Sequence, residues 1–106
     1  MHTDVKTKRR PGHIRQHGPE AFAAMRKAGR LTAEALDLMT EWVIPGVTTA
    51  ELDRRAFAFA MDHGAYPAPL NYRGYTHSIC TSINHVVCHG IPDDKPLREG
   101  DIVNVD

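Results

Sequence analysis

Cysteine is scarce in this sequence, with two residues among 106. Cys80 and Cys88 are separated by seven residues, a spacing that matches neither a Cys-x-x-Cys redox pair nor a structural zinc site. Long apolar runs are missing, since no stretch approaches the roughly 18 residues that a membrane-spanning helix needs. Charged residues also occupy the N-terminus, where a signal peptide would be apolar. These absences predict a reduced, cytoplasmic protein with no membrane partner.

Net charge is also absent, because 13 basic residues balance 13 acidic ones. The balance is uneven along the chain, however, and residues 1–17 form a basic arm. Such an arm could contact ribosomal RNA or another polyanion, although a short basic arm is also typical of a solvated tail. We therefore predict an arm over residues 1–17 and a folded part over residues 18–106. The charged residues of the arm are Lys6, Lys8, Arg9, Arg10 and Arg15, against the single acid Asp4.

The first regular segment is a long apolar pattern of helical period. Between Pro19 and Val43, apolar side chains recur at steps of three and four residues, which is the spacing of one helix face. Pro45 lacks an amide hydrogen and its ring clashes with the preceding turn, so the helix should end before it. We expect Met25 and Met39, on the apolar face, to lie in the core.

A second helix is predicted directly after this turn. Thr48 and Glu51 have the spacing of a capping box, in which a hydroxyl and a carboxylate satisfy the free amides of the first turn reciprocally. An apolar face then begins at Leu52. Gly64 suits the left-handed position that closes many helices, so the second helix should end there.

The rest of the chain has the composition of loops and strands. Residues 65–75 are rich in proline, tyrosine and glycine, which predicts a shaped loop. Ile79–Ile83 alternates in polarity and Val86–His89 follows a polar pair, so a hairpin is the simplest interpretation. Ile102–Asp106 reads as a third strand with no stop signal after it. Two helices followed by three strands predict an α+β fold that is incomplete at its C-terminus.

Asp106 and His89 are the candidates for metal or acid–base chemistry. The strand period places Asp106 on the same face as Asn104, opposite Val103 and Val105. A carboxylate among apolar neighbours is usually neutralised, paired or metal-bound, and the spacing alone favours a salt bridge or surface exposure over a metal site. His89 follows an apolar run and precedes Gly90, where an imidazole could ligate or donate a proton. From the residues alone, a core or edge histidine that is hydrogen-bonded to a backbone carbonyl is the favoured interpretation.

Tyr72, Tyr75 and Cys80 could line an apolar pocket. Two aromatic rings and a soft sulfur side chain would suit a thioether neighbour. Packing of a loop onto the sheet accounts for the same residues, and the two interpretations stay open at this point.

Two longer motifs favour the functional interpretation of these residues over the structural one. The run Ser-Ile-Asn-His-Val-Val-Cys-His-Gly-Ile-Pro over residues 82–92, followed by Gly-Asp-Ile-Val-Asn-Val-Asp over residues 100–106, resembles the type I methionine aminopeptidases. The upstream helix, Pro-Gly turn and second helix are also similar to that family. Only about the first 17 residues lie outside the resemblance.

The resemblance implies the first part of a pita-bread α+β fold and a parent enzyme that removes the initiator methionine of nascent proteins. The family uses two divalent ions, for which Co, Mn, Fe and Zn all suit carboxylate and imidazole ligands. Asp106 matches the first metal-binding aspartate. His89 matches the histidine that hydrogen-bonds the substrate at the scissile amide.

Other positions carry over in the same way. Tyr72, Tyr75 and Cys80 match the residues that line the methionine pocket, while Asn84 with Val86 matches a backbone region that can hold a monovalent cation. The family's remaining ligands, an aspartate, a histidine and two glutamates, would lie downstream of Asp106. The resemblance therefore implies that residues 1–106 alone are inactive, and that the parent enzyme is a monomer.

Two departures from the family pattern lie near the expected site. His85 stands where many relatives have glutamate, and Pro69 stands where some have a cysteine of the pocket. These substitutions imply a reshaped pocket rim.

Two alternatives use other chemistry. A non-catalytic protein of the same fold would keep the pocket or the basic arm for binding only. A small histidine-rich metal module would instead bind zinc and gain structure on doing so. The histidines are scattered without ligand spacing, which disfavours the second alternative.

Overall fold

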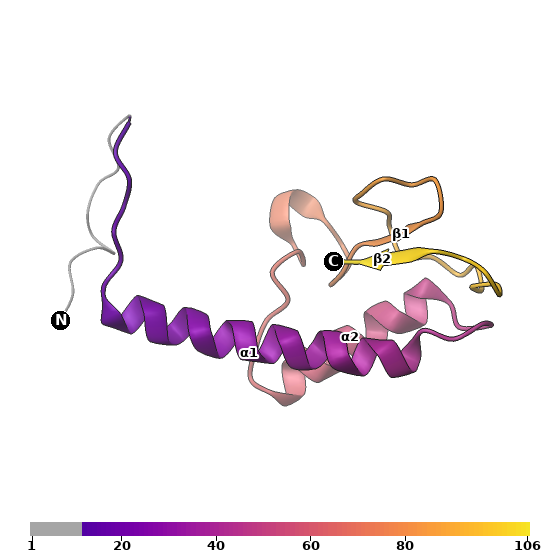
Figure 1. Ribbon diagram of the computed structural model, residues 1–106, viewed down its shortest axis with the longest axis horizontal. Helices are drawn as coiled ribbons and strands as arrows, with labels where there is room; N and C mark the ends of the chain where they lie inside the picture. The colour runs from indigo at the N-terminus through magenta and orange to yellow at the C-terminus, as the bar shows by residue number, and fades with distance from the viewer. Residues whose placement is uncertain (1–11) are drawn as a thin grey trace. The chain divides into compact units, whose positions relative to one another are not determined.

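The computed structural model describes residues 12–106 of the chain (Figure 1). It contains the helices α1 (Pro19–Trp42) and α2 (Thr49–Asp62), a 3-10 turn η2 (Tyr72–Gly74), and the strands β1 (Thr81–Ile83) and β2 (Val103–Val105). The described residues divide into two compact units, which meet between Leu36 and Asp37. Most of the predicted basic arm lies outside the described residues. Among those described, neither helix combines the length and apolar character that crossing a membrane requires.

Helix α1 forms where the apolar period predicted it. Its first residue is Pro19, and the backbone amide of Phe22 donates to the carbonyl of Gly18 at 3.1 Å. Met39 is buried, as expected. The same prediction was wrong for Met25, which is 71 % exposed. Among residues 12–36, α1 is the one helix or strand. The described part of this unit therefore has no second element that covers the helix face on which Met25 lies.

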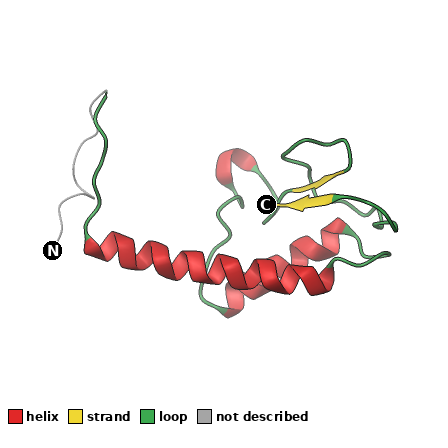
Figure 2. Cartoon of the chain, in the orientation of Figure 1, coloured by secondary structure: helices red, strands yellow, loops and turns green. Residues whose placement is uncertain are grey.

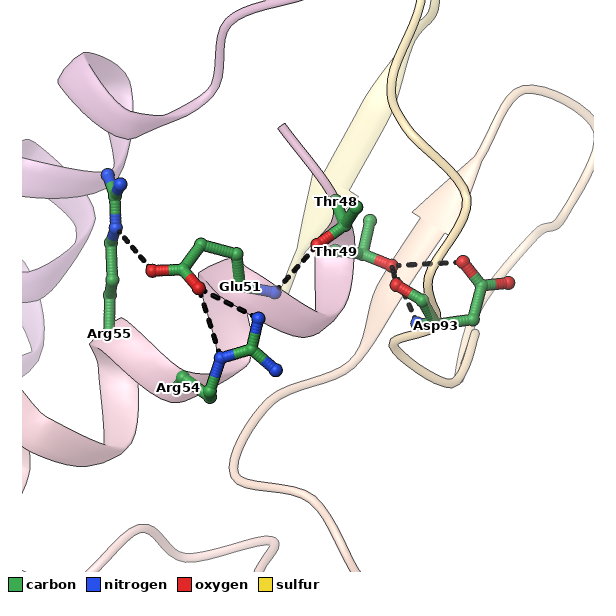
Figure 3. Close-up of polar contacts among 6 residues, drawn as sticks. All are labelled: Thr48, Thr49, Glu51, Arg54, Arg55 and Asp93. Atoms are coloured by element: carbon green, nitrogen blue, oxygen red, sulfur yellow. Dashed lines mark hydrogen bonds and ion pairs between the residues drawn. The ribbon is translucent and has the colours of Figure 1, made fainter. Parts of the chain in front are cut away.

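Helix α2 is capped by Thr48, but the capping box forms on one side only. The Thr48 hydroxyl accepts the backbone amide of Glu51 at 3.1 Å. The Glu51 carboxylate, however, turns to Arg54 at 2.8 Å and Arg55 at 3.0 Å (Figure 3). Two arginines one turn further along offer stronger partners than a neutral amide, so the reciprocal bond is not made. At the other end Gly64 has the predicted left-handed conformation, with φ of 70°.

The sheet consists of β1 and β2, which lie side by side and are paired antiparallel (Figure 2). In the register, Thr81 lies opposite Val105 and Ile83 opposite Val103. Backbone bonds extend the pair by one residue, because the Cys80 amide donates to the Asp106 carbonyl at 2.8 Å and the reverse bond measures 2.9 Å. The final strand is thus the partner of the first.

The predicted hairpin between Ile79–Ile83 and Val86–His89 is wrong, since the second segment is an irregular loop. Asn84 has a φ of 54° and His89 one of 58°, so the chain leaves the extended conformation at both ends of the segment. Val87 is 90 % exposed, which shows that an apolar residue there does not imply a buried strand. β1 is joined to this loop in two places, where the Val86 amide donates to the Ile83 carbonyl at 3.1 Å and near Gly90.

The core of residues 37–106 joins both helices to one face of the sheet. Met39, Leu52 and Leu97 are its buried centre. Val103 and Val105 pack against these residues while Asn104 and Asp106 are exposed on the other face, which confirms the predicted alternation. Further partly buried members of the cluster are Trp42, Val43, Val47, Ala56, Ile79 and Ile83.

The turn before β2 is anchored to the start of α2. The Ala50 amide donates to the Asp93 carbonyl at 2.8 Å, and the Asp93 amide donates to the Thr49 hydroxyl at the same distance (Figure 3). Thr49 is 1 % exposed, so these bonds satisfy polar groups that water does not reach. They hold the loop that leads into the second strand.

Candidate functional site

A cavity of about 750 Å³ lies within residues 37–106. Its walls come from the loop before β1, from the residue that precedes β1, from the loop after β1 and from the residue that follows β2. All five residues that the sequence predicted for pocket, histidine and metal roles line it, so the structure brings them together. They are Tyr72, Tyr75, Cys80, His89 and Asp106.

Tyr75 forms the half-buried part of the aromatic wall. Its hydroxyl donates to the Ile79 carbonyl at 2.8 Å, and its own carbonyl accepts the Asn71 amide at 2.7 Å. Burial raises the pKa of Tyr75 above its ordinary value, and the neighbouring Cys80 thiol raises it further. The phenol therefore stays protonated at neutral pH and keeps its bond to Ile79.

Tyr72 forms the open rim of the cavity. It is 63 % exposed, and the Arg73 guanidinium lies over its ring at 5.4 Å from the centroid. The Arg73 Nε also donates to the Tyr72 hydroxyl at 3.2 Å. Arg73 lines the cavity as well, although its place in the sequence predicted no role for it. Its φ of 50° shows that the loop, and not a helix pattern, places it.

Asp106 lies at the end of the two-stranded ladder. Its backbone exchanges both hydrogen bonds with Cys80, so the two residues are held opposite each other. Because the strand alternates, the Asp106 side chain leaves the sheet on the face opposite the core valines. A carboxylate and a thiol from distant parts of the sequence thus line the same cavity.

His89 is placed by its neighbour Gly90. The Gly90 amide donates to the Ser82 hydroxyl at 3.0 Å, and its carbonyl accepts the Thr81 amide at 2.8 Å. His89 itself has a left-handed φ of 58°, a conformation that costs energy for a residue with a side chain. The predicted strand end is thus a loop, fixed against β1 by the next residue.

Asn84 and Val86 are absent from the lining of this cavity. The Asn84 side chain donates to the Asp101 carboxylate at 3.1 Å and accepts the Ile102 amide at 2.9 Å. It therefore joins two turns. A monovalent cation would have to use the backbone carbonyls of this turn, and that role stays a prediction.

The donors that the described residues supply for a divalent metal ion are few. Among residues 12–106, no group of three or more histidine, cysteine, aspartate and glutamate side chains is placed to hold an ion. The cavity contains one carboxylate, from Asp106, and one imidazole, from His89. The described residues therefore do not make a metal centre by themselves, and they do not form the alternative histidine module.

Asp53 is a residue near the site that the sequence analysis did not select. Its Oδ1 accepts the backbone amides of Ser78 at 2.7 Å and Ile79 at 3.0 Å. Both amides directly precede Cys80. An acidic residue next to the buried Leu52 in α2 was the signal that could have pointed to it.

Comparison with known proteins decides the family. Residues 23–106 match the family model for metallopeptidase family M24. The chain belongs to metallopeptidase family M24. Divalent metal use is a property of this family, and the resemblance in the sequence motifs is confirmed.

The curated relatives are methionine aminopeptidases. The chain is 58 % identical over 93 residues to the methionine aminopeptidase of Rickettsia prowazekii, covering 88 % of the chain and 36 % of that protein. It is 53 % identical over 88 residues to methionine aminopeptidase 2 of Mycobacterium tuberculosis, covering 83 % and 31 %. The M24 chain thus spans about a third of the length of these relatives.

Solved structures give the same result for the fold. A crystal structure of methionine aminopeptidase from Rickettsia prowazekii matches with a TM-score of 0.86 and 57 % identity, covering 89 % of the chain and 38 % of that structure. The enzyme from Thermotoga maritima matches with a TM-score of 0.84 and 34 % identity, covering 88 % and 38 %. The α+β arrangement expected for part of a pita-bread fold is confirmed.

Proposed function

We propose that the protein to which this chain contributes is a methionyl aminopeptidase, which removes the initiator methionine from nascent proteins by metal-assisted peptide hydrolysis. The observation that carries the proposal is the single cavity that Tyr75, Cys80, His89 and Asp106 share. Membership of a metallopeptidase family and the names of the relatives support the same activity.

The apolar part of the cavity would receive the methionine side chain. Thioethers make favourable contacts with aromatic rings and with polarisable sulfur, so Tyr72, Tyr75 and Cys80 suit this group. Tyr75 is protonated and its hydroxyl is already bonded to Ile79. Its ring can therefore contact an apolar side chain without leaving a hydroxyl unpaired.

The polar part of the cavity would act on the peptide bond. We assign His89 to a hydrogen bond with the scissile amide, because His89 lines the same cavity as Cys80. A loop residue held on one side by Gly90 can keep a fixed position without being buried. Such a fixed donor stabilises charge that develops in the transition state.

Asp106 would be one metal ligand. We propose two divalent ions, Co, Mn, Fe or Zn, whose remaining ligands belong to the part of the relatives' length that this chain does not cover. Such ions supply Lewis-acid polarisation of a carbonyl and lower the pKa of a bound water. Since residues 12–106 do not hold these ions alone, residues 1–106 should show no peptidase activity.

The proposal is tested by peptide hydrolysis. The full-length protein should release methionine from Met-Ala-Ser, lose the activity on addition of a chelator and regain it with one of the four metals. Leu-Ala-Ser serves as the control peptide and should be cleaved poorly. If the full-length protein binds Met-Ala-Ser with every metal present and releases no methionine, the non-catalytic alternative replaces this proposal.

Three further expectations belong to the same proposal. We expect a cytoplasmic monomer whose N-terminal methionine substrates emerge from the ribosome, and a basic arm that contacts ribosomal RNA. Cosedimentation with ribosomes, compared between the protein with and without residues 1–17, tests the arm. Equal sedimentation of the two forms would contradict the contact.

A further inference from the structure

Asp53 reaches from α2 to the segment that leads into β1. Its Oδ1 accepts the amide of Ser78 at 2.7 Å and that of Ile79 at 3.0 Å, across 25 and 26 residues of sequence. Ser78 is 4 % exposed, so its amide has little access to water as a substitute partner. One carboxylate oxygen with two backbone donors is a strong and directional arrangement.

The two amides belong to Ser78 and Ile79, the residues directly before Cys80 in the cavity wall. Both backbone polar groups of Ile79 are bonded, because its amide donates to Asp53 and its carbonyl accepts the Tyr75 hydroxyl. Cys80 follows directly and pairs with Asp106 through two backbone bonds. A continuous set of hydrogen bonds thus runs from α2 to three residues of the cavity.

Asp53 itself does not line the cavity. Its effect on a bound molecule would therefore be indirect, through the position of the Tyr75 ring and the Cys80 side chain. Its bonds to the Ser78 and Ile79 amides, which directly precede Cys80, place the carboxylate behind the pocket wall.

We propose that Asp53 is a positioning residue of the cavity, whose carboxylate fixes the Ser78–Ile79 backbone and thereby sets the methionine pocket formed by Tyr75 and Cys80. This inference rests on the proposed function, since it assumes that the pocket receives a methionine side chain. In kinetic terms, the residue should affect substrate binding more than the chemical step.

The test uses Asp53→Ala and Asp53→Asn in the full-length protein, with Asp62→Ala as the matched control. Asp62 is an exposed carboxylate at the end of the same helix. With Met-Ala-Ser, Asp53→Ala should raise KM about tenfold, while kcat changes less than about threefold. Asparagine keeps an acceptor oxygen without the charge, so Asp53→Asn should raise KM only about threefold. Asp62→Ala should match the wild type.

A second measurement does not depend on activity. In a Cys88→Ser background, the rate of Cys80 alkylation by iodoacetamide reports how firmly the segment is held. Asp53→Ala should raise this rate about tenfold and Asp53→Asn about threefold, at temperatures where each variant is folded. A general loss of stability would speed alkylation in proportion to global unfolding, which circular dichroism measures on the same samples.

The outcomes separate the two proposals. Wild-type KM and wild-type alkylation in folded Asp53→Ala would overturn the positioning role. If that variant does not fold, wild-type values in Asp53→Asn would do the same. If the wild-type protein shows no hydrolysis with any metal, the proposed function fails, and the alkylation rates alone then decide whether Asp53 holds the cavity wall.

Discussion

Gly90 lies so close to the backbone of Thr81 that a side chain at position 90 has no space. A Cβ built on Gly90 would overlap the Thr81 carbonyl oxygen and lie 3.0 Å from the Cα of Ser82. The glycine is thus required for close approach, and the two hydrogen bonds that join it to β1 depend on this contact. The position of the preceding His89 depends on it as well.

Gly90→Ala should therefore destabilise the fold. The clashing atoms belong to the backbone of a strand and cannot move aside, so we expect a loss of about 3 kcal/mol in the free energy of unfolding. Gly29→Ala is the matched control, because Gly29 lies within α1 and a Cβ there meets nothing within 4 Å. That change should stabilise by about 0.5–1 kcal/mol. Denaturant unfolding of both variants measures the contrast, and equal stabilities would contradict the close contact.

Thr48→Ala should cost about 1 kcal/mol of stability, because it removes the hydroxyl that accepts the Glu51 amide at the start of α2. Thr40→Ala removes a hydroxyl of the same kind from an exposed position within α1, where it bonds only the Asp37 carbonyl. This control should stay within about 0.5 kcal/mol of the wild type. If both variants lose the same stability, the cap has no special contribution.

The acid sensitivity of the fold should depend in part on Asp101. The Arg98 backbone amide and then the Asn84 side chain lower the pKa of this carboxyl from its ordinary value. A pKa that is lower in the folded state stabilises the fold above the unfolded pKa and loses this effect as the pH falls through the folded value. We expect the melting temperature of the wild type to fall toward that of Asp101→Asn as the pH drops below about 4.

The control for this experiment is Asp94→Asn, at an exposed position of a neighbouring turn. This change removes a carboxylate while leaving the bonds of Asp101 to Arg98 and Asn84 in place. A gap between wild type and Asp101→Asn that stays constant from neutral to acidic pH would argue against the assigned bonds.

His89→Asn tests the proposed donor to the scissile amide. Asparagine tolerates the left-handed conformation of this position, so the loop should keep its shape while the imidazole is lost. In the full-length protein we expect kcat for Met-Ala-Ser to fall about 100-fold, with the melting temperature unchanged. His63→Asn, at the exposed C-terminal end of α2 and outside the cavity lining, should keep wild-type kcat. Similar kcat values for the two variants would remove His89 from the reaction.

The helices could be predicted from the sequence because their determinants are local. The apolar period, Pro45, Thr48 and Gly64 act within one or two turns of their own position, and both helices have nearly the predicted bounds. The reciprocal contact of Glu51 could not be predicted. Two arginines competed for the carboxylate, and the spacing rule does not weigh competing partners.

Strand pairing and the support of the site were harder to predict. Val86–His89 has the apolar composition of a strand, but the pairing is decided by Val103–Val105, which lies farther along the chain and meets the core. The role of Asp53 could not be predicted for a similar reason. Its partners are backbone amides, which every sequence contains, and they lie 25 and 26 residues away.

The backbone pair between Cys80 and Asp106 also sets an order of events in folding. Helices α1 and α2 depend on contacts within their own turns and can form early, whereas this pair closes a long loop and carries the entropic cost of doing so. We expect the strand ladder to form last. Until it forms, the thiol and the carboxylate that face the cavity are on independent parts of the chain, so the cavity exists only in the fully folded protein.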